Sequence, residues 1–242
     1  MEISIPAKLK ERYLWIKKHS ASDEQTGFAV ELAAADRKGL IADISGFISS
    51  LNGNLSYMQS WPEYDHTTHI LIQIEGITDP QPILKGISSV ESVTKVTLRQ
   101  TYSQTYGKRV IVLGGGAQVA QVAAGAIAEA DRHNIRGERI SVDTIAIVGE
   151  TEIANAVRAV GRLHRAAILV LAGALMGGKI SDAVGELKKL YGIPVMSLKM
   201  AGSVNRVSDI IVSDPLEAGV MAVMLISHIG KFNLLKVYKK EF

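Results

Sequence analysis

Cysteine is absent from this chain of 242 residues. Its absence excludes disulfides, thiolate nucleophiles, iron–sulfur clusters and cysteine-based zinc sites. Long apolar runs are missing too, because the best stretch, residues 218–229, is shorter than the roughly 20 residues that a spanning helix needs. That stretch is predicted to be a buried helix, and residues 1–18 are too charged for the core of a signal peptide. We therefore expect a cytoplasmic protein with no membrane partner.

The chain also has little excess charge. Its 27 lysines and arginines face 24 aspartates and glutamates, for a formal net charge of +3. The basic residues cluster only near the two ends, which is typical of solvated helix and tail surfaces. No nucleic-acid partner is indicated. With 47% hydrophobic residues, the chain has enough apolar material for buried cores.

The first half of the chain shows the pattern of an antiparallel α/β domain. A short amphipathic helix is expected at residues 6–19, ahead of elements in the order βαββαβ. Those elements are a strand at 28–36, a helix at 40–51, a hairpin of strands at 54–61 and 66–75, a helix near 83–89 and a strand at 90–98. This is the order of a ferredoxin-like fold, in which two helices cover one face of the sheet. The other face is expected to be covered by a partner subunit, by the second domain or by the first helix.

The second half has a different pattern. Its apolar runs are continuous, as in parallel strands buried on both faces, and helical patterns separate most of them. The runs are at 109–113, 144–148, 166–171, 193–198 and 209–212, and the helical patterns are at 117–133, 150–164, 180–191 and 215–229. We predict a doubly wound, Rossmann-like α/β domain. Residues 200–209 are too few for a full crossover helix, so a short helical turn or a functional loop is expected there.

These patterns divide the chain into three parts. Residues 1–26 are predicted to be a helix and linker, residues 27–102 an antiparallel domain, and residues 108–242 the Rossmann-like domain. The junction is placed in the polar stretch 101–108, where periodicity is lost.

Two turns in the first domain carry a resemblance to a known family. The first is Ala-Asp-Arg-Lys-Gly-Leu-Ile-Ala-Asp-Ile at 35–44, and the second is Leu-Asn-Gly-Asn-Leu at 51–55. Residues 28–100 resemble the ACT family, in which such turns join a strand to a helix and that helix to the next strand. Gly39 lets a ligand approach the backbone closely, and the helix that follows offers N–H groups suited to a carboxylate.

The resemblance implies a regulatory domain that binds an effector, usually an amino acid, between the first turn of one subunit and the Asn54 region of another. It therefore implies a homodimer or a higher homo-oligomer. The implied ligand-binding residues are Asp36, Gly39, Leu40 and Asp43 in the first turn, with Asn52 and Asn54 in the second. In the alternative reading, Asp36 only caps the helix, Gly39 only makes the turn, and the domain only dimerises.

The second domain has a glycine-rich turn directly after its first strand. Gly114, Gly115 and Gly116, with Gln118, form a candidate ligand-binding turn at the start of a helix. A dinucleotide fingerprint would need glycine or alanine at Val119 and an acidic residue about 20 positions later. Glu150 follows the second strand, but an apparent insertion at 133–143 makes the spacing too long. We expect a tight turn that binds another anion or polar ligand, and no cofactor.

The carboxyl ends of the parallel strands are expected to form one crevice. Asp214 is predicted to cap the last helix, with Pro215 at its first position. No catalytic residue is assigned, because His133 and His164 end their helices and so lie at the opposite edge of the sheet. No metal site is expected either, since His66 and His69 point to opposite faces of a strand.

The sequence thus predicts a regulatory protein that binds a small-molecule effector, with an amino acid as the expected ligand. The first alternative is a nucleotide-dependent or other metabolic enzyme, with its active site at the carboxyl ends of the second domain's strands. The second alternative is a structural interaction module in which neither site is occupied.

Overall fold

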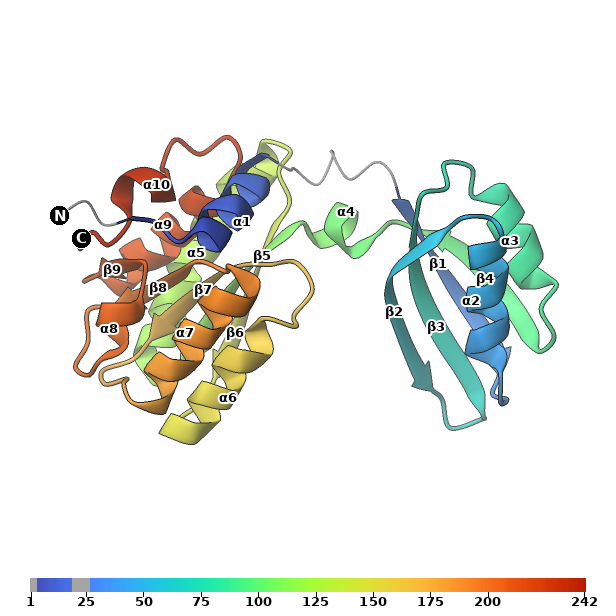
Figure 1. Ribbon diagram of the computed structural model, residues 1–242, viewed down its shortest axis with the longest axis horizontal. Helices are drawn as coiled ribbons and strands as arrows, with labels where there is room; N and C mark the ends of the chain where they lie inside the picture. Colours follow the sequence, from blue (N-terminus) through green and yellow to red (C-terminus); the bar gives the residue numbers. More distant parts are fainter. Residues whose placement is uncertain (1–3, 19–26) are drawn as a thin grey trace. The chain divides into compact units, whose positions relative to one another are not determined.

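The computed structural model describes residues 4–18 and 27–242, which form two compact units (Figure 1). Residues 27–105 form one unit, named here the antiparallel unit. Residues 4–18 and 106–242 form the other, named here the parallel unit. The antiparallel unit is therefore an insertion, since the chain enters it from the parallel unit and returns to the same unit.

The antiparallel unit has the predicted order βαββαβ. Its elements are β1 (Gly27–Ala35), α2 (Leu40–Ser50), β2 (Asn54–Pro62), β3 (Thr67–Glu75), α3 (Gln81–Ser88) and β4 (Val93–Arg99). The sheet order is β2-β3-β1-β4, and every neighbouring pair is antiparallel. Helices α2 and α3 cover one face (Figure 1). This arrangement confirms the ferredoxin-like prediction.

Alternation along β1 explains which face the helices cover. Val30 and Leu32 are buried with Ile44 and Ile48 of α2 in one apolar cluster. Burying such side chains is worth about 1.5 to 3 kcal/mol each, and this drives the helix onto the sheet. The opposite face is partly covered by α4 (Tyr102–Tyr106), which the sequence analysis took for irregular chain. The rings of Tyr102 and Tyr57 lie 5.4 Å apart, edge to face.

The parallel unit is the predicted doubly wound domain. Its elements after the junction are β5 (Lys108–Gly114), α5 (Ala117–Ile135), β6 (Ile140–Ala146), α6 (Glu150–Val160), β7 (Ala166–Ala172), α7 (Lys179–Tyr191), β8 (Val195–Leu198), α8 (Val204–Val207), β9 (Ile210–Val212), α9 (Pro215–Ile226) and α10 (Leu234–Val237). The order is β6-β5-β7-β8-β9, and all pairs are parallel. Every residue of β7 is buried, as a central strand with helices on both faces requires.

Helix α1 (Ala7–Lys18) packs on the parallel unit beside α9 and α7 (Figure 1). Leu9, Tyr13 and Ile16 are buried in its core. The Tyr13 hydroxyl accepts the N–H of Leu234 at 2.9 Å. Because its apolar face is occupied in this way, α1 is not available to cover the antiparallel sheet, so that option from the sequence is wrong.

The start of β6 differs from the prediction, whereas α8 and α9 agree with it. Strand β6 begins at Ile140, four residues before the predicted start, because residues 140–143 pair with β5. Residues 200–209 contain α8, the short helical turn that was expected. Helix α9 is buried along most of its length, which confirms the buried helix predicted near 218–229. No helix in the described ranges is long and apolar enough to cross a membrane.

Candidate functional site

A concave site with a volume of about 580 Å³ lies in the antiparallel unit, where β1 leads into α2. This volume is within the range of small-molecule sites. One wall is the turn between β1 and α2 with the start of the helix, and the other comes from β2 and β3. The lining residues are Asp36, Arg37, Gly39, Leu40, Ile41, Ala42, Ser60, Pro62, Thr68 and Ile70.

The start of α2 gives this site its chemistry. Gly39 precedes the helix with φ +86°, a left-handed conformation in which glycine is favoured. No side chain among the described residues caps the helix, so the alternative is wrong in making Asp36 its cap, while its dimerisation part stays untested. The first N–H groups of a helix have no partner within it, and the helix dipole places partial positive charge there. The site therefore offers donors to an anion.

Arg37 and Asp43 hold the turn in shape. Arg37 Nη2 lies 2.6 Å from Asp43 Oδ2, and the guanidinium also donates to the carbonyl oxygens of Glu91 and Lys38. Asp43 is outside the lining of the site, so it acts on the site only through Arg37. An exposed pair of this kind adds little stability, and its effect is to fix where the guanidinium lies.

The hairpin supplies the opposite wall. The antiparallel register sets Ser60 opposite Ile70 and Pro62 opposite Thr68. Ser60 and Thr68 thus bring hydroxyl groups to the site. The sequence analysis did not select Arg37, Ser60 or Thr68. Arg37 belongs to the turn that carries the ACT resemblance, so the sequence contained a signal for it. The hydroxyls of Ser60 and Thr68 reach the site through the register of the hairpin, which cannot be read from the sequence.

Asn52 and Asn54 lie at the other end of α2. The helix has 11 residues, so about 16 Å of helix separates its two ends. Asn52 has φ +60° directly after the helix, and Asn54 begins β2. Neither lines the site of its own chain. Their contribution to a neighbouring subunit stays a prediction.

The glycine-rich turn of the parallel unit is only partly open. A Cβ on Gly114 would lie 1.8 Å from the carbonyl oxygen of Ala172, and one on Gly115 would lie 2.8 Å from Val148 Cγ1. Gly114 is needed for close packing because its neighbour is backbone, whereas the neighbour of Gly115 is the exposed side chain of Val148, which can move. A Cβ on Gly116 would meet nothing within 4 Å, and no side chain in the described part of the chain caps α5 after it. The partly exposed Gln118 lies in the first turn of that helix.

Glu150 makes a contact within the protein, and its predicted part in ligand binding stays a prediction. It begins α6, and its Oε1 accepts the N–H of Lys179 at 2.7 Å. It therefore supplies an acceptor to the first turn of α7. Glu150 lies far from Gly116 in the sequence because the 19 residues of α5 and the whole of β6, which begins at Ile140, come between them. The reading of residues 133–143 as an insertion is wrong.

Other polar groups at the carboxyl ends of the strands are also held by the protein. Ser203 Oγ accepts the N–H of Gly178 at 3.2 Å, and Asn205 Oδ1 accepts from the Ser197 hydroxyl at 3.1 Å. Asp214 Oδ1 accepts the N–H of Glu217 at 2.8 Å, with a proline at the first position of α9. The predicted cap at Asp214 is confirmed, and all three side chains make hydrogen bonds within the protein.

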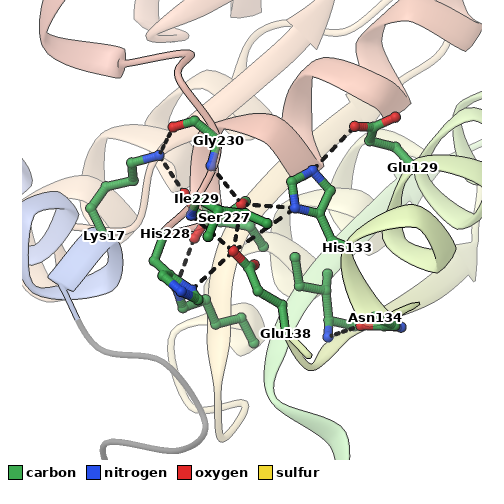
Figure 2. Close-up of polar contacts among 12 residues, drawn as sticks. Lys17, Glu129, His133, Asn134, Glu138, Ser227, His228, Ile229 and Gly230 are labelled. Atoms are coloured by element: carbon green, nitrogen blue, oxygen red, sulfur yellow. Dashed lines mark hydrogen bonds and ion pairs between the residues drawn. The ribbon is translucent and has the colours of Figure 1, made fainter. Parts of the chain in front are cut away.

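A buried polar network lies at the opposite edge of the parallel sheet (Figure 2). His133 Nδ1 is 2.9 Å from Ser227 Oγ, and its Nε2 is 3.1 Å from Glu129 Oε1. The sequence analysis placed His133 at this edge but expected no serine partner. Serine, histidine and glutamate in this order resemble a nucleophile with its base, so the direction of each hydrogen bond decides their role.

The directions of its hydrogen bonds exclude such a role for Ser227. Its hydroxyl donates to Glu138 Oε1 at 2.7 Å and accepts the N–H of Gly230 at 2.9 Å. Since a hydroxyl has one proton, His133 Nδ1 must donate to Ser227 and cannot remove its proton. The Ser227 side chain is also fully buried. The network is structural.

The same network anchors α1. Lys17 Nζ donates to the carbonyl oxygens of Ser227, Gly230 and Phe232, in the segment after α9. Burial lowers the pKa of Lys17, and the nearby Glu138 carboxylate opposes that shift. The loop after α9 thus contacts α1 through Lys17 and α5 through His133.

Within residues 4–18 and 27–242, no three histidine, aspartate or glutamate side chains are grouped so as to hold a metal ion. His69 instead stacks on Trp61, with ring centroids 5.6 Å apart, and His66 lies in a turn with φ +65°.

Solved structures similar to parts of the chain include an ACT domain and a deformylase. The ACT domain from GTP pyrophosphokinase of Chlorobium tepidum is 16% identical, with a TM-score of 0.26, over 30% of this chain and 95% of that one. A formyltetrahydrofolate deformylase from Pseudomonas syringae is 17% identical, with a TM-score of 0.29, over 66% of this chain and 61% of that one.

Sequence relatives match much more of the chain. An uncharacterized protein of Methanocaldococcus jannaschii is 51% identical over 209 residues, which are 86% of this chain and 96% of the relative. An uncharacterized protein of Archaeoglobus fulgidus is 47% identical over 212 residues, with the same two coverages. The model of one family, described as a domain of unknown function (DUF5612), matches residues 99–241. This chain belongs to that family.

Proposed function

We propose that this protein is a regulatory protein whose antiparallel unit is an ACT-like domain that binds a small carboxylate effector of the amino-acid class. The observation that carries this proposal is the site of about 580 Å³ into which the uncapped start of α2 opens. Backbone N–H groups at a helix start suit a carboxylate.

The remaining groups suit the rest of an amino acid. The exposed carboxylate of Asp36 lies on the same site and can pair with an ammonium group, while Ser60 and Thr68 can complete hydrogen bonds. Arg37, whose charge is balanced by Asp43, lines the site beside the helix start. A zwitterion with adjacent carboxylate and ammonium groups matches this distribution better than a simple anion.

The covalent arrangement supports regulation. Both ends of the antiparallel unit connect to the parallel unit, and β1 and β4 lie side by side, with Ala29 opposite Arg99. A ligand that binds two states of the chain with different affinity shifts the balance between them. We propose that the effector acts on the parallel unit through these two connections, in a homodimer or larger assembly.

The enzyme alternative has less support. The candidate polar groups at the carboxyl ends of the parallel strands mostly bind other parts of the protein, and Ser227 has no available base. An added side chain at Gly116 would meet no atom within 4 Å, so this turn is the position at which the enzyme alternative can be tested. We therefore prefer the regulatory function.

The test is a thermal-shift screen of the full-length protein against the twenty amino acids and common nucleotides, because a ligand selective for the folded state raises the melting temperature. Gly39→Asp adds negative charge at the start of α2, and Gly39→Asn adds an isosteric neutral side chain with the same backbone strain. We expect an amino acid to stabilise the wild type most, Gly39→Asn less and Gly39→Asp not at all, because both side chains obstruct the approach to the backbone and only aspartate also adds charge. A shift caused only by nucleotides and removed only by Gly116→Asp would favour the enzyme.

A further inference from the structure

Three of the residues that line the candidate site are buried, and they are named here its floor. They are Leu40, Thr68 and Ile70, which are 3%, 8% and 0% exposed. The other lining residues are half-buried or exposed. Thr68 has the one polar side chain of the floor, so its hydroxyl is the group there that can select a ligand by hydrogen bonding.

The Thr68 hydroxyl makes no hydrogen bond with any residue in the described ranges 4–18 and 27–242. The strand register explains why. Thr68 lies opposite Ala34 of β1 and Pro62 of β2, and neither side chain has a polar atom. Ile70, the next residue on the same face of β3, has none either. Buried polar side chains are mostly paired, so Thr68 is a hydrogen-bonding group to which the protein supplies no partner.

The unpaired hydroxyl and the uncapped start of α2 line the same space. That space has a volume of about 580 Å³, which is enough for a whole amino acid. A ligand whose carboxylate binds at the start of α2 therefore has room to place its side chain on the floor.

We infer that the effector is an amino acid with a neutral side chain that forms hydrogen bonds, and that Thr68 is the residue that determines this specificity. The inference rests on the proposed function, because it takes the carboxylate of the ligand to be bound at the start of α2. An aliphatic side chain on the floor would shield the Thr68 hydroxyl from water without giving it a hydrogen bond, and a buried unpaired group weakens binding about 10-fold. A hydroxyl or amide group pairs with it instead.

The floor also disfavours a charged side chain. Leu40 and Ile70 place hydrocarbon beside Thr68, and one hydroxyl cannot replace the water that a carboxylate or ammonium group would lose. The charged residues that line the site are Asp36 and Arg37, in the turn before α2. Arg37 is paired with Asp43, and Asp36 is assigned to the ammonium group that every amino acid carries.

The test is calorimetric titration of the full-length protein with amino acids that have nearly the same shape and differ in hydrogen bonding. The two pairs are L-threonine with L-valine and L-asparagine with L-leucine. L-aspartate, compared with L-asparagine, measures the effect of charge, and glycine measures binding without a side chain. We expect the polar member of at least one pair to bind about 10-fold more tightly than the apolar member, and asparagine to bind more tightly than aspartate.

Thr68→Val replaces the hydroxyl with a methyl group of similar size. In this variant the affinity for the preferred polar amino acid should fall about 10-fold, while the affinities for valine, leucine and glycine do not fall. The melting temperature of the free variant should be at least that of the wild type, because the substitution removes an unpaired buried hydroxyl. Thr68→Ser keeps the hydroxyl and should keep the preference. Ser60→Ala is the control, because Ser60 lines the same site but is exposed, and it should keep the preference too.

The outcomes separate this inference from the proposed function. Equal affinities within both pairs, tighter binding of aspartate than of asparagine, or an unchanged preference in Thr68→Val would overturn the specificity assigned to Thr68. Each of these results would still leave an amino acid bound, as the proposed function requires. Absence of binding by all twenty amino acids would overturn the proposed function, and this inference with it.

Discussion

The two units use their polar side chains in opposite ways. In the antiparallel unit, Asp36 and Arg37 surround an open site, and α2 begins without a capping side chain. In the parallel unit, His133 and Glu138 are buried and bound by other protein groups, while α9 begins with a capping aspartate. Helices α5, α6 and α7 of the parallel unit also begin without a capping side chain from the described residues, so the comparison teaches that an uncapped start indicates binding only together with open volume and polar groups such as those beside α2.

Among the substitutions that test this comparison, we expect the largest loss of stability in the buried network. His133→Ala takes the buried hydrogen-bond partner from Glu129, whereas Glu138 keeps Ser227 and Ile229, and losing a hydrogen bond to a buried charged group costs about 1.5 to 3 kcal/mol. Urea unfolding of the parallel unit, followed by Trp15 fluorescence in a Trp61→Phe background, measures this loss. The neighbouring Arg132→Ala is the control, because that side chain is 71% exposed. A loss below about 1 kcal/mol in His133→Ala would contradict a structural role for the network.

The next largest loss of stability is expected at the capped start of α9. Asp214→Ala removes the acceptor for the N–H of Glu217, and loss of such a cap costs about 1 kcal/mol. The same unfolding experiment should show a weaker parallel unit. Asp214→Asn keeps a capping oxygen and should restore most of the stability. If Asp214→Ala were as stable as the wild type, capping would not distinguish α9 from α2.

The smallest effects compare one glycine from each unit. Gly46 in α2 and Gly185 in α7 are exposed within their helices, and a Cβ on either would meet no atom within 4 Å. Alanine at each position should stabilise its own unit by about 0.5 to 1 kcal/mol. Calorimetric melting of the two variants measures this gain. Gly39→Ala should instead destabilise, because its φ is +86°, so a gain there would contradict the strained turn.

Much of the fold could be predicted from periodicity. The alternation in β1 and the buried runs of β5 and β7 distinguished a sheet with one helix-covered face from a sheet covered on both. The place of α1 could not be predicted, because an amphipathic helix shows that it has a partner but not which one. The start of β6 was missed because Asp143 interrupts its apolar pattern while still pairing with Ile111.

The candidate site was only half visible in the sequence. Asp36, Gly39 and Leu40 lie in one local turn, so the chain order already brings them together. Ser60 and Thr68 reach the site through the hairpin register, which shifts between Leu55 and Tyr57. A shift of one residue moves side chains to the other face, so their place could not be derived from alternation alone.

The most direct test of the account uses Ala42, which lines the site in the first turn of α2. A glutamate at this position favours the helix but puts a negative charge where the carboxylate of the ligand should bind. Calorimetric titration of Ala42→Glu and of the neutral Ala42→Gln with the amino acid that stabilises the wild type compares the two. We predict at least a 10-fold loss of affinity in Ala42→Glu alone, with both variants folded. Equal affinity in the two variants would contradict carboxylate binding at the start of α2.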